Sequence, residues 1–133
     1  MARTFLTFGK KEHVLLSACL TKVLSSLASG ASLDAATTVC QRNLDTGDPE
    51  SVLSQVRGRT VNAVLTKCAG VAPEDIGSPC DPAASSMADV VQCVLGEQAE
   101  KVEEVIAAEY RHACSLLGAV GLAAAFPGVC PGP

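Results

Sequence analysis

The cysteines are the residues whose type and spacing point most directly to chemistry. Seven of them are spread over the 133 residues, and none belongs to a CxxC motif. Neither a thioredoxin-type redox pair nor a zinc knuckle is therefore available. An even distribution of cysteines is typical of a disulfide framework, which forms in oxidising compartments. Their positions are Cys19, Cys40, Cys68, Cys80, Cys93, Cys114 and Cys130.

An odd number of cysteines leaves at most three disulfides within one chain. The seventh is then free, buried or paired with another chain. Helical phase narrows the pairing, because Cys93 and Cys114 are expected opposite the apolar stripe of the last helix, where another segment must cross to meet them. We therefore predict two disulfides that tie irregular segments to this helix, Cys80–Cys93 and Cys114–Cys130. One further pair is expected among Cys19, Cys40 and Cys68.

Other catalytic or metal-binding groups are scarce. The imidazoles are His13 and His112, and His112 lies two residues from Cys114, so that their side chains point in different directions on a helix. Glu109 and His112 match the Glu-x-x-His motif of di-iron bundles once, but the second copy is missing. We interpret the acidic run as a solvated helix face and predict no enzyme, no metal site and no cofactor. This run comprises Glu97, Glu100, Glu103, Glu104 and Glu109.

The charge is divided unevenly between the two halves of the chain. Residues 1–67 carry eight Lys or Arg and five Asp or Glu, whereas residues 68–133 carry two and nine. The halves are expected either to pack on each other or to attract the opposite half of a second copy. Nucleic-acid binding is not expected, because the basic half is only weakly positive and lacks interleaved aromatic residues.

The apolar pattern predicts four helices and no strand within the body of the chain. Gly30 ends the first helix, Ser32 caps the second, Pro49 starts the third and Ser86 caps the last and longest. Residues 71–85 are expected to be a Pro/Gly-containing loop held by Cys80. The predicted ranges are Lys11–Ser29, Leu33–Leu44, Pro49–Ala69 and Ser86 to Leu117 or Val120.

The two ends of the chain are expected to be irregular. Residues 1–10 alternate Thr with apolar residues, which favours an extended arm ahead of a single helical domain over residues 11–133. Phe5 and Phe8 are expected to attach this arm either to its own core or to a partner. The opening residues do not form a signal peptide, so a processed chain with Met1 added is favoured over another export route or reduced thiols. A Pro/Gly-rich tail ends the chain, and no stretch is apolar and long enough to span a membrane.

Short motifs of the second half resemble Cys-rich helical modules of uncharacterised secreted bacterial proteins. The resemblance covers residues 68–130 and rests on Lys67-Cys68, Ser78-Pro79-Cys80-Asp81, Val90-Val91-Gln92-Cys93-Val94, Glu109-Tyr110 and Phe126-Pro127-Gly128-Val129-Cys130. It implies an exported, disulfide-bonded protein and brings no activity with it.

The sequence as a whole predicts an all-α protein, an irregular four-helix bundle stapled by disulfides. The expected function is a non-enzymatic structural or protein-interaction module, a subunit of an extracellular or periplasmic assembly with a protein partner or a second copy. The alternative is an extracellular carrier of a small apolar ligand such as a lipid. With only four aromatic residues, the core is expected to be mainly aliphatic.

Overall fold

The computed structural model describes residues 2–72 and 86–131, and within these ranges the regular secondary structure is all helical. Five α-helices are followed by one 3-10 helix in the tail. The helices are α1 (Ala2–Ser29), α2 (Asp34–Leu44), α3 (Val52–Lys67), α4 (Met87–Glu109), α5 (Ala113–Ala119) and the 3-10 helix η2 (Ala123–Ala125).

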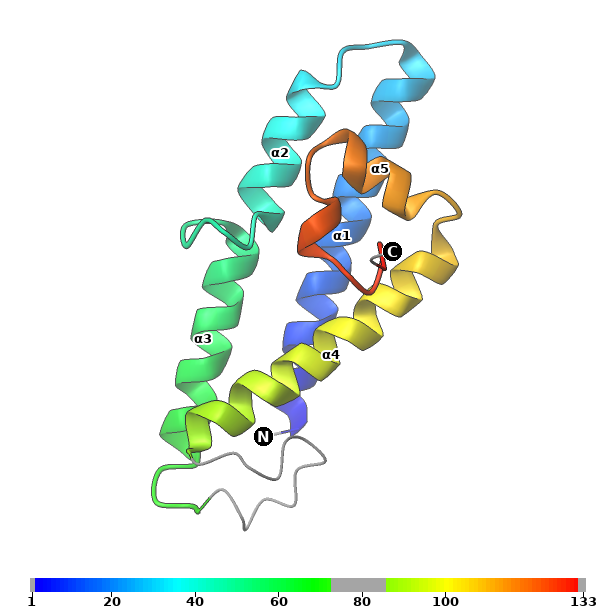
Figure 1. Ribbon diagram of the computed structural model, residues 1–133. Helices are drawn as coiled ribbons and strands as arrows, with labels where there is room; N and C mark the ends of the chain where they lie inside the picture. The colour runs from blue at the N-terminus through cyan, green and yellow to red at the C-terminus, as the bar shows by residue number, and fades with distance from the viewer. Residues whose placement is uncertain (1, 73–85, 132–133) are drawn as a thin grey trace.

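The long helix α1 is the centre of the arrangement. It contacts α2, α3, α4 and α5. As Figure 1 shows, α2 and α3 stand end to end along one side of α1, and α4 crosses α1 diagonally on another side. The tail that follows α5 folds back over α4. The result is an elongated bundle in which each helix packs part of its surface against α1.

Local sequence signals explain several helix ends. Gly30 ends α1 with a φ of 70°, a conformation that residues with a Cβ rarely adopt. Ser51 caps α3, since its Oγ accepts a hydrogen bond from Ser54 N at 3.2 Å. Ser86 caps α4 in the same way, with Asp89 N as the donor at 3.2 Å. Each capping oxygen pairs with an N–H that the helix itself leaves without a partner.

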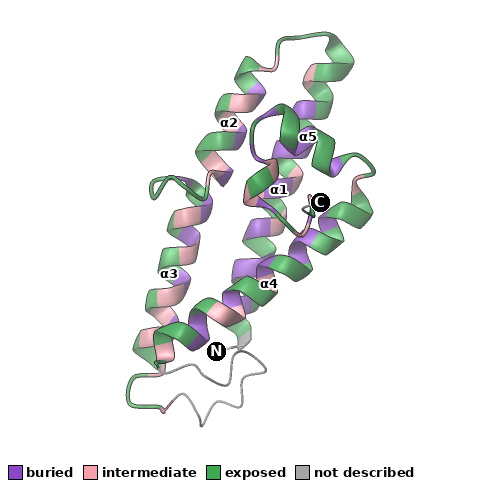
Figure 2. Ribbon diagram, viewed as in Figure 1, coloured by how far each residue is buried: buried purple, intermediate pink, exposed green. Residues whose placement is uncertain are grey.

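The core is mainly aliphatic and lies on the sides of the helices that face α1 (Figure 2). From α1 it takes Phe8, Leu16, Leu20 and Val23, which recur at intervals of three to eight residues and are at most 1% exposed. The other elements contribute Leu44, Leu53, Val64, Leu95, Ile106, Leu117 and Phe126. Burial of this apolar stripe explains why α1 persists over 28 residues.

The extended arm predicted for residues 1–10 is wrong over its described part. Residues 2–10 form the first turns of α1, and both phenylalanines are buried in the core, with 6% of Phe5 and 1% of Phe8 exposed. The alternation of Thr with apolar residues indicated a strand, but Phe5, Phe8, Glu12 and Leu16 also follow a helical repeat. Tertiary packing favours the helix, and the two rings pack into the protein's own core, which is one of the two alternatives that the sequence leaves open.

The prediction of a single long last helix is also wrong. It is divided at Tyr110, whose backbone is extended with φ −118° and ψ 106°. The break turns α5 back toward α1, which buries Ala113, Leu116 and Leu117. The described residues therefore hold five α-helices instead of four. The predicted loop over residues 71–85 lies almost wholly outside the described residues.

Candidate functional site

Two disulfides join pairs of cysteines within the described residues. Cys19 on α1 is bonded to Cys40 on α2, with Cα atoms 5.1 Å apart. Cys114 on α5 is bonded to Cys130 in the tail, with Cα atoms 5.0 Å apart, which is the pair that the sequence predicts. Cys19–Cys40 is one of the three pairs that the sequence leaves open. These bonds indicate that the chain folds in an oxidising environment.

The remaining cysteines are described in part. Cys93 is disulfide-bonded. The predicted Cys80–Cys93 pair involves Cys80, which lies outside the described residues. Cys68 carries a free thiol, is partly buried and stands at the C-terminal cap of α3. Of the three cysteines left open by the sequence, it is therefore Cys68 that has no disulfide partner.

A buried cluster of charged side chains lies where α1, α3 and α4 meet. Glu12 of α1 is 1% exposed and Glu103 of α4 is 5% exposed. Arg57 of α3 supplies the positive charge that acts on both carboxyls. Glu12 Oε2 and Arg57 Nε are buried without a hydrogen-bond partner. The prediction of a solvated acidic face is therefore wrong for Glu103, because tail residue Gly128 covers it and donates its N–H to Glu103 Oε1 at 3.1 Å.

This environment shifts the protonation of both carboxyl groups. Burial, reinforced by the nearby negative charge of Glu103, raises the pKa of Glu12 from 4.5 to about 8, against the opposing effect of Arg57. Burial also raises the pKa of Glu103, while the Gly128 hydrogen bond and Arg57 lower it and Glu100 raises it. At neutral pH the cluster therefore contains a protonated Glu12.

A surface groove lined by both charged and apolar side chains lies between α1 and α3. Two adjoining hollows, of about 390 and 420 Å³, share Thr7, Lys11, Val56 and Arg59, so they form one continuous groove. We call it the basic groove. Its α1 wall comprises Arg3, Thr4, Thr7, Phe8, Lys10, Lys11, Val14 and Leu15, and its α3 wall comprises Val52, Val56, Arg59, Thr60, Ala63 and Lys67.

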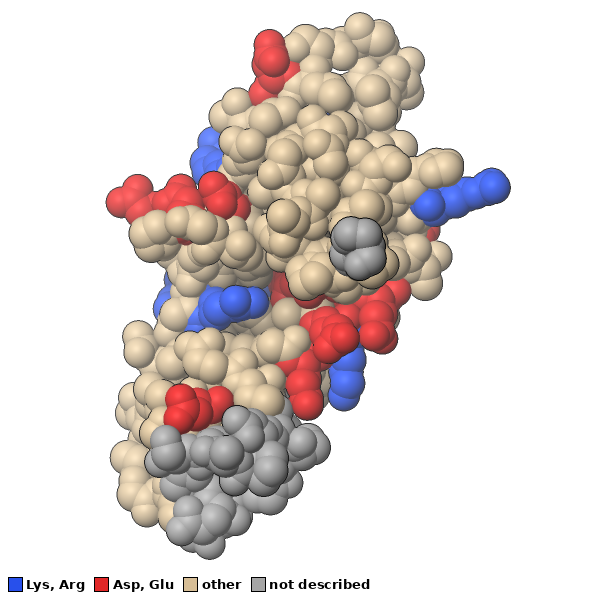
Figure 3. All heavy atoms as spheres, viewed as in Figure 1, with Lys and Arg blue, Asp and Glu red and all other residues tan. Residues whose placement is uncertain are grey.

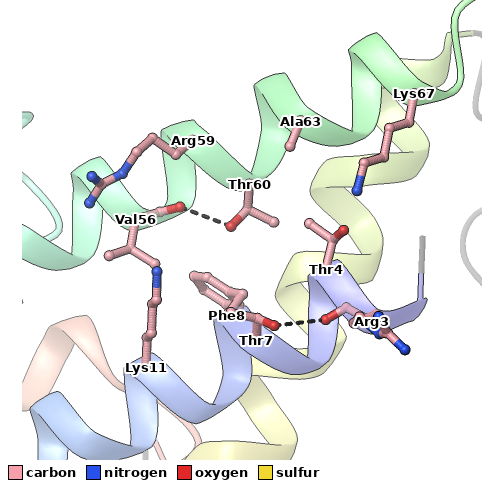
Figure 4. Close-up of a pocket in the computed structure, with 10 residues that line it drawn as sticks. All are labelled: Arg3, Thr4, Thr7, Phe8, Lys11, Val56, Arg59, Thr60, Ala63 and Lys67. Atoms are coloured by element: carbon pink, nitrogen blue, oxygen red, sulfur yellow. Dashed lines mark hydrogen bonds between the residues drawn. The ribbon is translucent and has the colours of Figure 1, made fainter.

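Cationic side chains lie in pairs toward the two ends of the groove region drawn in Figure 4. Arg3 and Lys67 stand at one end of the view, and Lys11 and Arg59 stand at the other. Lys11 and Lys67 extend from opposite helices into the space between them, on either side of Phe8 in this view. The hydroxyls of Thr7 and Thr60 donate within their own helices, to Arg3 O at 3.0 Å and Val56 O at 2.9 Å.

The cations of the basic groove are not neutralised by the rest of the described chain. Arg3, Lys10, Lys11, Arg59 and Lys67 are all exposed. Within residues 2–72 and 86–131, none of them has an ion-pair partner; the ion pair present there joins His13 and Glu109. Beyond Lys11 the groove becomes apolar, with Val14, Leu15 and Val52 on its walls. Positive charge without a partner, next to apolar surface, is suited to an acidic amphipathic ligand.

The other candidate chemical groups do not assemble into a site. His13 Nε2 lies 2.6 Å from Glu109 Oε1 and links α1 to α4, whereas His112 is exposed at the N-terminal cap of α5. The Glu109-x-x-His112 motif is interrupted by the break at Tyr110. Among the described residues, no three His, Cys, Asp or Glu side chains are placed to hold a metal ion. No described helix combines the length and hydropathy that a membrane span requires.

Sequence reasoning missed both the buried cluster and the basic groove. Glu12 could have been found by extending the apolar stripe of α1 backwards, since it falls between Phe8 and Leu16 on the same face. The groove depends on α1 and α3 lying antiparallel, which the sequence does not encode locally. Comparison with known proteins adds no relative, since no protein family, curated protein or solved structure matches the chain.

Proposed function

We propose that this protein is a non-enzymatic interaction module, a disulfide-stabilised subunit of a larger extracellular or periplasmic assembly. Its binding surface is the basic groove, and its partner presents an acidic amphipathic helix. The observation that carries this proposal is the set of five exposed cations without an ion-pair partner among the described residues. Uncompensated charge of one sign at a groove raises the local concentration of oppositely charged ligands and speeds their association.

The shape of the groove supports a helical partner. It follows two antiparallel helices from Thr4 to Leu15 on α1, a length of ~17 Å at 1.5 Å per residue. A third helix of about three turns fits along such a channel, with acidic side chains next to the cations and, further along, apolar side chains next to Val14 and Val52. Helix-in-groove recognition of this kind uses side chains spaced three and four residues apart.

Binding of a defined acidic helix tests the proposal. The probe is a fluorescently labelled peptide of about 14 residues, ~21 Å when helical, with Glu at every third or fourth position and Leu at adjoining positions. Fluorescence anisotropy measures its Kd for the wild-type protein. The control peptide carries Lys in place of every Glu. The acidic peptide is expected to bind more weakly as salt rises, since the charges are exposed, and the basic peptide is expected not to bind.

Matched variants locate the binding surface. The groove variant is Lys11→Glu/Arg59→Glu, and its control is Lys22→Glu, which changes charge on an exposed residue of α1 outside the groove. The groove variant is expected to raise the Kd at least about tenfold, which corresponds to about 1.4 kcal/mol. The control is expected to bind like the wild type. Equal affinity of the groove variant and the wild type would overturn the proposal.

A second candidate function is the carrier of a small apolar ligand. The observation that favours it is the apolar part of the groove, a hollow of about 420 Å³ beside Lys10 and Lys11. Small-molecule sites commonly have volumes of about 300–1,000 Å³. An acyl chain with an anionic head could lie there, so laurate is added to the peptide titration. Displacement of the peptide by laurate at micromolar concentration favours the carrier, whereas no displacement favours the protein partner.

A further inference from the structure

An acidic ridge runs along the outward face of α4. Glu97, Glu100 and Glu104 are exposed and occupy one side of the helix, because their spacing of three and four residues matches the helical repeat. Lys101 lies at the edge of this ridge. Figure 3 shows the Asp and Glu side chains gathered along α4 below the tail. Within this half of the chain the ridge is the main exposed concentration of charge that the structure describes.

The dimensions of the acidic ridge match those of the basic groove. On α1, Arg3 and Lys11 are eight residues apart, and on α3 Arg59 and Lys67 are also eight residues apart, so each pair spans ~12 Å. Glu97 and Glu104 are seven residues apart and span ~10.5 Å. A helix lying in the groove therefore places one Glu between the two cations at each end, and Glu100 between those ends.

The same register also matches the apolar surfaces. Suppose that an α4 helix from another molecule lies in the groove with its Glu104 between Lys11 and Arg59. Its next turn then extends past these cations by ~5.4 Å. That turn carries Val105, which is half exposed, and Ala108, which is exposed. On the groove, Val14 and Val52 occupy the corresponding position beyond Lys11. The charged and the apolar contacts therefore favour the same orientation, in which the inserted α4 helix runs parallel to the α1 helix of the groove.

Resting on the proposed function, we infer that the partner in the basic groove is a second copy of this chain, which inserts the acidic ridge of its α4. The groove is lined by α1 and α3 alone, and α4 passes behind both helices in the view of Figure 4. Groove and ridge therefore face different directions, so one contact cannot be reciprocated within the same pair of molecules. The contact is heterologous, and it adds subunits head to tail.

Light scattering of the full chain after size exclusion tests this inference. The wild type is expected to form dimers and larger species whose proportion rises with protein concentration. The association constant is expected to fall at least about tenfold between about 50 mM and 500 mM NaCl, because exposed charges are screened. The groove variant Lys11→Glu/Arg59→Glu and the ridge variant Glu97→Lys/Glu104→Lys are each expected to be monomeric.

Light scattering of a mixture of the groove variant and the ridge variant is the decisive experiment. The groove variant retains its ridge and the ridge variant retains its groove, so an equal mixture is expected to form a 1:1 dimer that does not grow. The triple variant Lys11→Glu/Arg59→Glu/Glu104→Lys is expected to associate again, because the charges are then exchanged at the end of the groove where Glu104 lies. Circular dichroism checks that each variant keeps its helical content, and Lys22→Glu/Arg42→Glu, which changes the net charge by the same amount as the groove variant, is its control.

The outcomes separate this inference from the proposed function. A wild type that is monomeric at every concentration in low salt overturns the inference, as does association that survives the ridge substitutions. If the wild type is monomeric and the acidic peptide still binds the basic groove, the inference fails and the proposed function stands. If neither self-association nor peptide binding is observed, both fail.

Discussion

Gly128 of the tail donates its backbone N–H to the Glu103 carboxylate of α4, with Gly128 N and Glu103 Oε1 3.1 Å apart. The approach is close because Gly128 has no side chain. A Cβ at this position would lie 2.7 Å from Glu103 Cβ and 3.3 Å from the Glu100 carbonyl oxygen. The absence of a side chain therefore allows the tail to cover Glu103, and the Cys114–Cys130 disulfide holds the tail near α5.

Gly128→Ala is expected to lower the free energy of unfolding by about 1–3 kcal/mol, since the new methyl group meets the rigid Cβ of Glu103. Urea denaturation measures this change. The control is Gly118→Ala on α5, where a Cβ meets no neighbour and the helix gains up to about 1 kcal/mol. Equal stability of the two variants would contradict the close approach.

The pH dependence of stability in the Glu12→Gln variant tests the buried carboxyl cluster. The pKa of Glu12 is raised from 4.5 to about 8 in the folded protein, so its contribution to stability is fully present below pH 4.5 and is lost as pH rises to about 8. The loss reaches at most about 1.4 kcal/mol per pH unit. Glu12→Gln carries no titrating proton, so its stability relative to the wild type is expected to rise between about pH 5 and pH 8.

Urea unfolding at a series of pH values checks this expectation. The control is Glu50→Gln, which changes an exposed carboxyl in the same way. Parallel pH profiles for the wild type and Glu12→Gln would show that the carboxyl of Glu12 is not protonated at neutral pH. A remaining slope in Glu12→Gln is expected to belong to Glu103, whose pKa is also raised by burial.

Phe8→Ala tests the position of the N-terminal turns. Phe8 is 1% exposed and the centroid of its ring lies 5.8 Å from the guanidinium carbon of Arg57. Its removal is expected to lower the free energy of unfolding by about 3–5 kcal/mol, through lost burial and a cavity. Leu6→Ala is the control, because Leu6 is exposed on the same helix. An unchanged stability in Phe8→Ala would contradict the burial of Phe8 in the core and would favour the alternative that Phe8 contacts a partner.

Cys114→Ser/Cys130→Ser removes the disulfide that holds the tail. The cysteines are separated by 16 positions, and a loop of this size is expected to contribute about 3 kcal/mol to stability. Thermal unfolding without reductant measures the loss. Cys68→Ser is the control, since Cys68 has a free thiol. A decrease in Cys68→Ser as large as in the double variant would indicate that Cys68 takes part in a covalent bond.

Some elements of the fold follow from local sequence. Gly30 and Ser86 mark helix ends by backbone and capping chemistry that acts within four residues, and both were predictable. The Cys114–Cys130 pair was predicted from the phase of one continuous helix, yet the helix is interrupted at Tyr110. The tail lies close to Cys114 whether or not the helix is continuous. The predicted pairing is therefore correct although the predicted continuous helix is not.

Other features depend on contacts between distant segments. Residues 2–10 alternate Thr and apolar side chains, so the strand pattern and the helix pattern compete locally, and only packing on α3 and α4 favours the helix. Glu12 and Glu103 are buried by neighbours that are remote in sequence, Arg57 and Gly128 among them. The basic groove has the same origin, because its walls are contributed by two helices joined through α2.

Mapping of the acidic peptide on the isotope-labelled protein by NMR tests the central claim, that the basic groove is the interaction surface. Amide shift changes are expected to be confined to residues 3–15 of α1 and 52–67 of α3 and to reverse at high salt. Changes centred instead on α2 or on the α1–α4 face around Gln98 and Val102, or no changes at all, would contradict this claim.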